Sequence, residues 1–480
     1  MAPADGASTR TGSPVLDGLR RFAHLPSWLS DAVAPEVLRA ALLRAAPQLA
    51  DDIVAFDAER LRLKEGAPVW RAAYRLVLSG QGGESRRLRL SGTLERPSAA
   101  GRGPGEATAS GPVGAPGWQV RLPELGLSLA VEGGDAALEA LPDLTEPDRA
   151  RPLLEAAIRS GGAHPDLRIE RCTAEVMRYK PGSRCTVRYR LVLDAGSQER
   201  GCPEVVVAKT YHGDKGANAY AGMRALWETP LSQGDVVTLA APLAYLPEQR
   251  VLVQGPVPED RILKDLVRAT FAAGADPPAV AALDAVLART AAGLAALHRS
   301  EAWHGELVTF EDERAELERV VGRLAVPLPE TEGAGTALLA RIGEVADRTP
   351  ADPPRPSHTS FRPAQVLLHG DRVGFIDFDG FGRAEPGLDL GLFLATTANV
   401  AVRAAPADRR AAALATVDEL VARFLRRYQE EAPVSVERVA LWQALALLTA
   451  VLHCWTKVRP DRLEPNLQLL EHHVRSVGLT

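Results

Sequence analysis

The chain has 480 residues and a formal net charge of −5. This length suggests two or three domains, and the negative charge argues against broad nucleic-acid binding. No apolar run of 18 or more residues predicts a membrane span, and the polar N-terminal stretch lacks the apolar core of a signal peptide. The four cysteines have neither paired nor metal-ligand spacing, which favours reduced cytoplasm. Only six of the 56 basic residues are lysines, so a lysine inside a motif is informative.

The first 160 residues read as helices followed by strands. Apolar residues spaced three and four apart predict amphipathic helices over 14–60, and 61–78 reads as two strands around a Lys-Glu-Gly turn. Residues 97–117 are almost entirely Pro, Gly, Ala and Ser, which predicts a flexible loop with nothing to bury. A helix is expected over 145–160, with Thr145 as its N-cap.

The sequence of 61–78 has an echo at 176–193. Both stretches contain Lys-x-Gly and end in Tyr-Arg-Leu-Val-Leu. One interpretation is a duplicated small β-domain that serves as a cap. The other is a pair of Arg-rich hairpins that resemble each other because the composition is biased.

The rest of the chain is a β-rich segment followed by a helical one. Residues 169–210 predict three strands, with a hairpin around Lys180-Pro181-Gly182-Ser183 and a third strand that carries Lys209. A small β-rich lobe followed by a large helical lobe is an α+β organisation. Helices are expected over 216–229, 279–299, 311–325, 335–347, 387–400, 406–431 and 435–455.

Residues 358–380, HTSFRPAQVLLHGDRVGFIDFDG, carry the most specific pattern in the chain. His358 is followed two residues later by Ser360 and five residues after that by Gln365. A short hairpin and an Ile-Asp pair ending in Asp377 come next. Together with the helix LARTAAGLAALHRS and the stretch EPGLDLGLFLA, this order resembles the aminoglycoside phosphotransferase and choline kinase-like family over residues 170–455.

The resemblance implies a two-lobed protein-kinase-like fold with ATP and magnesium in the cleft. It places Ser360 where the family has its catalytic Asp, and Gln365 where it usually has Asn; some members, the maltokinases among them, carry Gln. It assigns Asp377 to magnesium, with the amide oxygen of Gln365 as a second ligand. His358 belongs to the same catalytic segment. Because serine cannot act as a carboxylate base, the central question is whether phosphate transfer persists.

The cofactor residues follow from the same resemblance. Lys209, in VVVAK, has the local pattern of the lysine that holds the α- and β-phosphates. Lys180 and Gly182 occupy the place of the phosphate loop, where a glycine turn can present backbone N–H groups to anions. Gln254 and Val257 resemble the hinge that receives adenine through backbone groups. A strand-end lysine in solvent, an ordinary hairpin turn and a plain linker would explain the same residues.

Several residues either depart from the family pattern or resemble a family motif at the wrong place in the chain. The helix after Lys209 offers no acid before Glu228 to pair with that lysine, and Arg184 could add positive charge near the turn. Asp379 is a candidate second metal ligand, replacement base or turn former, whereas Asp389 resembles the structural Asp that braces the catalytic loop. The tripeptide His369-Gly370-Asp371 spells the family's catalytic sequence, but it lies inside the hairpin and is interpreted as a turn.

Three functions remain open at this point. The first is a kinase-like phosphotransferase that uses ATP–Mg²⁺ to phosphorylate a hydroxyl of a small molecule or biosynthetic peptide, with Ser360 in the base position. The second is a nucleotide-binding pseudokinase that acts as a partner or scaffold, and the third is an interaction module without nucleotide. No nucleic-acid or membrane partner is expected. The expected domains are a cap at 1–150, an N-lobe at 151–257 and a C-lobe at 258–480.

Overall fold

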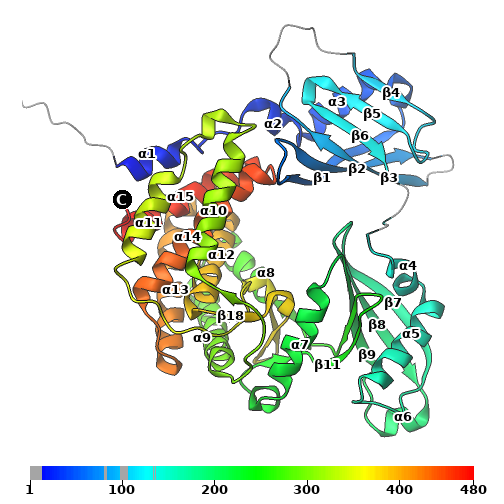
Figure 1. Ribbon diagram of the computed structural model, residues 1–480, viewed down its shortest axis with the longest axis vertical. Helices are drawn as coiled ribbons and strands as arrows, with labels where there is room; N and C mark the ends of the chain where they lie inside the picture. Colours follow the sequence, from blue (N-terminus) through cyan, green and yellow to red (C-terminus); the bar gives the residue numbers. More distant parts are fainter. Residues whose placement is uncertain (1–12, 81–83, 98–105, 133–134, 136) are drawn as a thin grey trace, which may run out of the picture. The chain divides into compact units, whose positions relative to one another are not determined.

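The computed structural model describes residues 13–80, 84–97, 106–132, 135 and 137–480 (Figure 1). The chain divides into two compact units, each assembled from separate stretches of sequence. Unit 1 contains Met1–Gly133, Glu311–Thr349 and Ala444–Thr480, and unit 2 contains Gly134–Phe310 and Pro350–Gln443. The predicted division into a cap, an N-lobe and a C-lobe stays a prediction.

Unit 1 is built on an antiparallel six-stranded sheet in the order β1-β2-β3-β6-β5-β4. Along β2, Trp70, Tyr74 and Leu76 are buried while Arg71 and Arg75 are exposed, as expected for a sheet with one covered face. The strands are β1 (Ile53–Leu63), β2 (Trp70–Ser79), β3 (Ser85–Leu94), β4 (Thr108–Ser110), β5 (Gln119–Leu122) and β6 (Leu127–Val131). The helices are α1 (Pro14–Arg20), α2 (Ser27–Asp31), α3 (Pro35–Ala45), α10 (Phe310–Ala325, in this unit from Glu311), α11 (Thr336–Ala346) and α15 (Pro460–Ser476).

Three predictions for the first 160 residues need correction. The helices end at α3, and residues 53–60 belong to β1, because pairing along the whole of β2 outweighs the helical spacing of the apolar residues. In the predicted loop 97–117, residues 98–105 lie outside the described ranges, but Thr108–Ser110 forms β4 and pairs with β5. Thr145 ends α4 and donates its hydroxyl to the Leu141 carbonyl, so it does not cap the following helix.

The β-rich part of unit 2 is a five-stranded antiparallel sheet in the order β11-β12-β9-β8-β7. Helix α5 lies against the sheet (Figure 1), and its apolar face joins a core with Val187, Tyr189 and Val206. The three strands predicted for 169–210 are confirmed. The elements of this part are α4 (Leu141–Thr145), α5 (Pro147–Ser160), β7 (Ile169–Lys180), β8 (Arg184–Leu193), α6 (Ala195–Glu199), β9 (Val205–Tyr211), α7 (Lys215–Trp227), β11 (Pro242–Leu246) and β12 (Val251–Gln254).

The remainder of unit 2 is mainly helical and carries two small sheets, β10-β17-β16-β13 and β14-β18-β15. The α+β class is therefore confirmed, and the predicted helices agree with the structure to within about four residues at each end. The helices are α8 (Leu263–Ala272), α9 (Pro277–Arg299), α12 (Pro386–Ala404), α13 (Arg410–Glu431) and α14 (Val436–Thr456), whose residues divide between the units after Gln443. The strands are β10 (Thr238–Leu239), β13 (Arg261–Ile262), β14 (Leu307–Val308), β15 (Arg355–Ser357), β16 (Val366–His369), β17 (Arg372–Phe375) and β18 (Gly382–Ala384).

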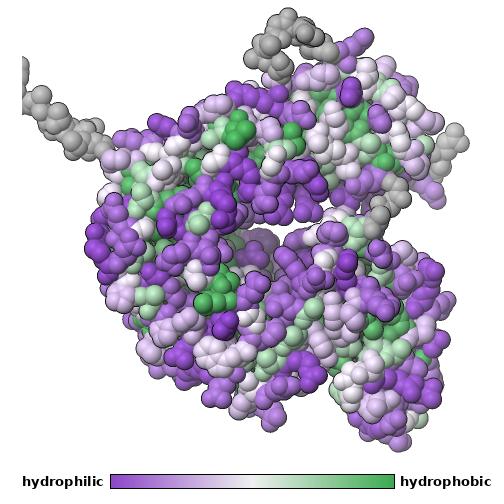
Figure 2. Space-filling model, in the orientation of Figure 1, coloured by the Kyte–Doolittle hydropathy of each residue, from purple (hydrophilic) through white to green (hydrophobic). Residues whose placement is uncertain are grey.

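Two helices, α9 and α14, are long and apolar enough to cross a membrane by length and composition. The share of the apolar window that is buried inside the protein is 50% in α9 and 67% in α14, so the two helices are weak evidence for membrane spans. Hydrophilic residues cover most of the surface in Figure 2, and hydrophobic residues form only small separate patches there.

Candidate functional site

The hairpin β16–β17 delivers Asp377 to the site. Val366 pairs with Phe375 and His369 with Arg372, so Gly370 and Asp371 form the turn that was predicted for this tripeptide, and His369 ends β16. Two residues after β17, Asp377 has φ 73° and ψ 49°. This left-handed conformation is uncommon except in Gly, Asn and Asp, and it marks a position where the backbone is constrained by its surroundings.

The segment that contains His358 and Ser360 is braced from α12. The buried Asp389 carboxylate accepts the backbone N–H of His358 at 2.7 Å and that of Phe361 at 3.4 Å. His298 of α9 contacts the same carboxylate through Nε2 at 3.2 Å and contacts Tyr428 through Nδ1 at 2.7 Å. Asp389 therefore positions the backbone of this loop, which is the structural role that was predicted for it from the sequence.

His358 and Ser360 form a hydrogen-bonded pair. His358 Nε2 lies 3.0 Å from the Ile376 carbonyl oxygen, which can only accept, so Nε2 is the nitrogen that carries the proton when the ring is neutral. Nδ1 is then an acceptor, and the Ser360 hydroxyl, 3.2 Å away, donates to it. Between them, Thr359 has φ 59° and donates its hydroxyl to the Gly380 carbonyl at 2.6 Å. A β-branched residue with positive φ is rare, so this loop is held in one conformation.

Lys209 reaches the turn that carries Asp377. Its Nζ lies 3.2 Å from Asp377 Oδ1 and 3.7 Å from an oxygen of Asp379. Tyr211, two residues further along β9 and so on the same face, donates its hydroxyl to Asp379 Oδ1 at 2.8 Å. The Lys209 side chain is only 10% exposed. A lysine this buried is normally paired, and here its partners are the two carboxylates of the turn.

Arg184, the first residue of β8, completes the cluster. Its two terminal nitrogens lie 3.1 Å and 3.3 Å from the two oxygens of Asp377. The first of these nitrogens also donates to Asp379. The guanidinium thus engages Asp377 as a bidentate fork, the geometry in which arginine binds carboxylates most strongly. We call Arg184, Lys209, Asp377 and Asp379 the charge cluster.

The electrostatics of the charge cluster favour the ionised form of Asp377. Burial alone would raise the pKa of the Asp377 carboxyl, but the positive charges of Lys209 and Arg184 outweigh it and hold that pKa far below the ordinary value. The pKa of Tyr211 is raised well above its ordinary value by burial and by the neighbouring Asp379. Asp377 is therefore a carboxylate, and Tyr211 a neutral donor, at physiological pH.

The two predicted residues of the phosphate loop lie beside the charge cluster. Burial, and repulsion by Arg178 and Arg184, lower the pKa of Lys180 to about 8. Gly182 has φ 63° and open space around it, as a tight turn requires. Its N–H is already used, since it donates to the Asp135 carboxylate at 2.8 Å. The turn thus binds the carboxylate of Asp135, an anion of the chain itself, where a nucleotide phosphate was predicted.

Three predicted residues, Gln254, Val257 and Gln365, are buried or partly buried. Gln365 is buried at the end of a short 3₁₀ turn before β16, and its Oε1 has no hydrogen-bond partner among the described residues. Gln254 is the buried last residue of β12. Val257 packs so closely on Gly374 of β17 that a Cβ at position 374 would clash with the Val257 side chain. The roles of Gln254 and Val257 in holding adenine stay a prediction.

A divalent cation does not fit the charge cluster as it stands. Gln365 offers one unsatisfied buried oxygen, which would suit a cation. However, both oxygens of Asp377 accept from Arg184, and both oxygens of Asp379 are engaged by Tyr211 or Arg184. Across the described ranges no group of three or more His, Cys, Asp or Glu side chains could hold a metal ion.

Sequence reasoning missed several contacts of the charge cluster. The place of Tyr211 could have been predicted, because it lies two residues after Lys209 and so on the same face of the strand. The contact of Arg184 with Asp377 could not, because it joins residues 193 positions apart. The helix after Lys209 presents Asn218, not an acid, and its amide donates to the Phe381 carbonyl at 3.0 Å. Glu228 forms an exposed pair with Arg224 instead.

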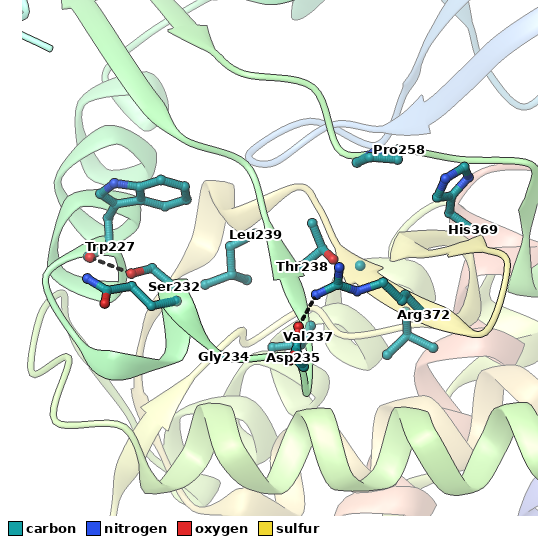
Figure 3. A pocket seen from close by; sticks show the side chains of 13 residues that line it. Trp227, Ser232, Gly234, Asp235, Val237, Thr238, Leu239, Pro258, His369 and Arg372 are labelled. Carbon is teal, nitrogen blue, oxygen red and sulfur yellow. Dashed lines mark hydrogen bonds and ion pairs between the residues drawn. The ribbon is translucent and has the colours of Figure 1, made fainter. Parts of the chain in front are cut away.

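A separate pocket of about 430 Å³ lies between the α7–β10 connection and the β16–β17 hairpin (Figure 3). Trp227, Leu239 and Pro258 line it, and Arg372 crosses it to pair with Asp235 at 2.6 Å. No residue of the charge cluster lines this pocket.

The sequence of residues 243–426 matches the phosphotransferase enzyme family. The predicted family resemblance is confirmed. The matched residues include His358, Ser360, Gln365 and Asp377, whereas Arg184 and Lys209 lie before them. No curated protein matches the chain.

Solved structures of kinases resemble the chain at low sequence identity. A glucosamine kinase in complex with glucosamine, ADP and inorganic phosphate is 15% identical, with a TM-score of 0.46, and the match covers 96% of this chain and 98% of that one. A choline/ethanolamine kinase family protein from Mesorhizobium loti is 14% identical, with a TM-score of 0.44 and coverages of 69% and 99%. The choline kinase LicA from Streptococcus pneumoniae is 13% identical, with a TM-score of 0.43 and coverages of 69% and 99%.

Proposed function

We propose that this protein is a phosphotransferase that binds ATP and transfers its terminal phosphoryl group to a hydroxyl of a small molecule or peptide. The observation that carries the proposal is the meeting of Lys209 with Asp377, at 3.2 Å, beside the segment that matches the phosphotransferase family. A strand-borne lysine next to the acidic turn after the catalytic hairpin is the arrangement that holds nucleotide phosphates in kinases.

Ser360 and His358 supply a route for the acceptor proton. The Ser360 hydroxyl donates to His358 Nδ1, so its oxygen lone pairs are free to accept the proton of an acceptor hydroxyl. As the acceptor oxygen bonds to phosphorus and the bond to the ADP oxygen breaks, that proton passes to Ser360 Oγ. The proton of Ser360 moves in turn to His358, whose positive charge lies within reach of the Asp377 carboxylate. Such a relay is weaker than a carboxylate base, so slow transfer is expected.

The family resemblance implies magnesium as the companion of ATP, with Gln365 and Asp377 as its ligands. Gln365 has an oxygen to offer, but Asp377 would have to leave Arg184 first. The proton route described above does not depend on the metal.

The test is a transfer assay with ATP and a panel of hydroxyl acceptors that includes glucosamine, choline, ethanolamine and streptomycin. Lys209→Ala removes a direct phosphate contact and should weaken ATP binding roughly 10-fold to 100-fold, the usual range for a charge-assisted hydrogen bond. Equal ATP affinity in the wild type and Lys209→Ala would refute the assignment of Lys209.

Ser360→Asp distinguishes a slow kinase from a scaffold. A carboxylate at this position restores a direct base, and a positioned base contributes roughly 10²–10⁴-fold to a rate. Transfer to an acceptor, or background ATP hydrolysis, should therefore rise at least tenfold while ATP affinity changes little. Ser360→Ala is the matched control, because it removes the relay without adding a base, and its rate should fall.

The alternative function is a nucleotide-binding pseudokinase that acts as a partner or scaffold. The observation in its favour is that Arg184 engages both oxygens of Asp377, the carboxylate on which metal-assisted transfer would depend. ATP binding with no gain of transfer in Ser360→Asp would favour this alternative.

A further inference from the structure

The position of Arg184 is fixed by strand register. Arg184 pairs with Tyr211 across β8 and β9, and Thr186 pairs with Lys209. Because side chains alternate along a strand, Arg184 and Tyr211 lie on the face that also carries Lys209. The turn 181–183 is short, so the guanidinium starts from a rigid hairpin, not from a long loop.

The guanidinium occupies the oxygens that a cation would need. It contacts both oxygens of Asp377 and one of Asp379, and its side chain is 19% exposed. In kinases, metal ions held by such a carboxylate bridge the phosphate oxygens and neutralise the charge that develops on them. Arginine carries a permanent charge and binds phosphate as well as carboxylate through the same planar fork.

The local charges favour an anion over a second cation. Arg184 and Lys209 already balance Asp377 and Asp379, and the positive charges of Arg178 and Arg362 also act on neighbouring Lys180. A divalent cation would enter a cluster that is neutral at its centre and positive at its edge. A phosphate chain would meet surplus positive charge and a ready set of donors.

We propose that the Arg184 guanidinium takes the place of the divalent cation, so that unit 2 binds a polyphosphate chain without a metal. The inference rests on the proposed function only in naming ATP as the natural source of that chain. Lys180, Arg184 and Lys209 contact the phosphate oxygens, while Asp377 and Asp379 hold the arginine and lysine in position.

The test is calorimetric titration of the full chain with ATP and with inorganic tripolyphosphate, each in excess EDTA and in excess Mg²⁺. Both ligands should bind in EDTA, and Mg²⁺ should not improve the affinity for either by more than about twofold. Binding of both ligands only in Mg²⁺ would overturn the inference and leave the proposed ATP-dependent function intact. Binding of tripolyphosphate but not ATP in EDTA would support the inference while removing the proposed use of ATP. Failure of both ligands in both buffers would overturn the inference.

Arg184→Gln should weaken binding in EDTA at least tenfold and make the remaining binding depend on Mg²⁺, since Asp377 Oδ2 then loses its partner and becomes free for a cation. Arg188→Gln is the matched control, because Arg188 lies on the same strand and pairs with the exposed Glu175 at 2.6 Å. Arg188→Gln should bind like the wild type. If Arg184→Gln fails to fold, the wild-type titrations in EDTA and Mg²⁺ still decide the inference. Unchanged EDTA binding in a folded Arg184→Gln would overturn it.

Discussion

The hairpins β1–β2 in unit 1 and β7–β8 in unit 2 share a scaffold but differ in charge. Each follows a five-residue helix and a longer helix that begins with proline, namely α2 and α3 in unit 1 and α4 and α5 in unit 2. The longer helix lies against the first strand of the hairpin in both units. In each second strand every other residue is buried, ending at Leu78 and Leu193, and β2 buries Ala73 in addition.

Two further details match. The buried Tyr74 donates its hydroxyl to the Ala32 carbonyl just after α2, and the buried Tyr189 donates to the Leu144 carbonyl within α4. Each turn also contains a glycine in the left-handed region, with φ 73° at Gly66 and 63° at Gly182. The sequence echo therefore extends to element order, burial pattern and a buried hydrogen bond, which favours duplication over composition bias.

The two hairpins differ in the residue that lies five positions before the buried tyrosine, Tyr74 in unit 1 and Tyr189 in unit 2. Unit 2 has Arg184 there as the first strand residue, directly opposite the acidic turn. Unit 1 has Val69, the last residue of a longer turn that spans 64–69. The same scaffold thus holds a charge cluster in one unit and an apolar side chain in the other, so the chemistry depends on the residue at the turn and not on the hairpin.

The largest expected effect comes from breaking the charge cluster. Asp377→Asn keeps a residue that tolerates positive φ but leaves Arg184 and Lys209 short of a partner. It should lower the free energy of unfolding by about 2 kcal/mol, below the figure for fully buried pairs because these side chains are partly exposed.

Chemical denaturation of Asp377→Asn and wild type measures this effect. The lowered pKa of Asp377 sets the sign: its contribution is fully present above the ordinary carboxyl pKa of 3.8 and declines as the pH falls below that value. Glu65→Gln is the counterpart in unit 1, because Glu65 is 83% exposed and pairs with Arg323. It should cost less than about 0.5 kcal/mol. Equal costs for the two variants would contradict the assigned difference.

The shared tyrosines should matter equally. Tyr74→Phe and Tyr189→Phe each remove a buried hydroxyl and leave a backbone carbonyl without its donor. Each should cost about 1–2 kcal/mol, the usual penalty for an unsatisfied buried group. Unfolding curves of both variants, followed by denaturant, give the two values. A loss in one hairpin with none in the other would argue that the likeness of the two scaffolds is superficial.

Much of the fold could be predicted from local patterns, but the charge cluster could not. The β16–β17 hairpin and the order His358, Ser360, Gln365 and Asp377 are local in sequence, and turn residues and alternation reveal them. Residues 53–60 were misread as helix because their apolar spacing fits two periods, and only pairing with β2 decides between them. The engagement of Asp377 by Arg184 depends on the β-rich and the helical part of unit 2 meeting, and no local pattern encodes such a contact.

The two turn glycines should respond alike in stability. Gly66→Ala and Gly182→Ala each place a Cβ in the left-handed region, which costs roughly 1 kcal/mol although both sites have open space. Only Gly182→Ala should also change anion binding, because Gly182 neighbours Lys180 and donates to Asp135. Thermal melting of both variants with and without tripolyphosphate measures the two effects. A tripolyphosphate effect in Gly66→Ala would contradict the separation of roles between the hairpins.

The smallest effect concerns the lysine before the second turn. The folded-state pKa of Lys180 is lowered from 10.5 to about 8 by burial and by Arg178 and Arg184, so between these pH values the unfolded state binds more protons and stability rises with pH.

A bound polyphosphate would counter the repulsion of Lys180 by Arg178 and Arg184 and raise the pKa of Lys180 again. Binding near pH 8 should therefore take up a fraction of a proton, and affinity should fall as the pH rises above 8. Titration calorimetry in buffers of different ionisation enthalpy measures the uptake. Lys180→Gln should abolish the uptake while Arg184 still holds the phosphates, whereas unchanged uptake in that variant would assign the proton to another group.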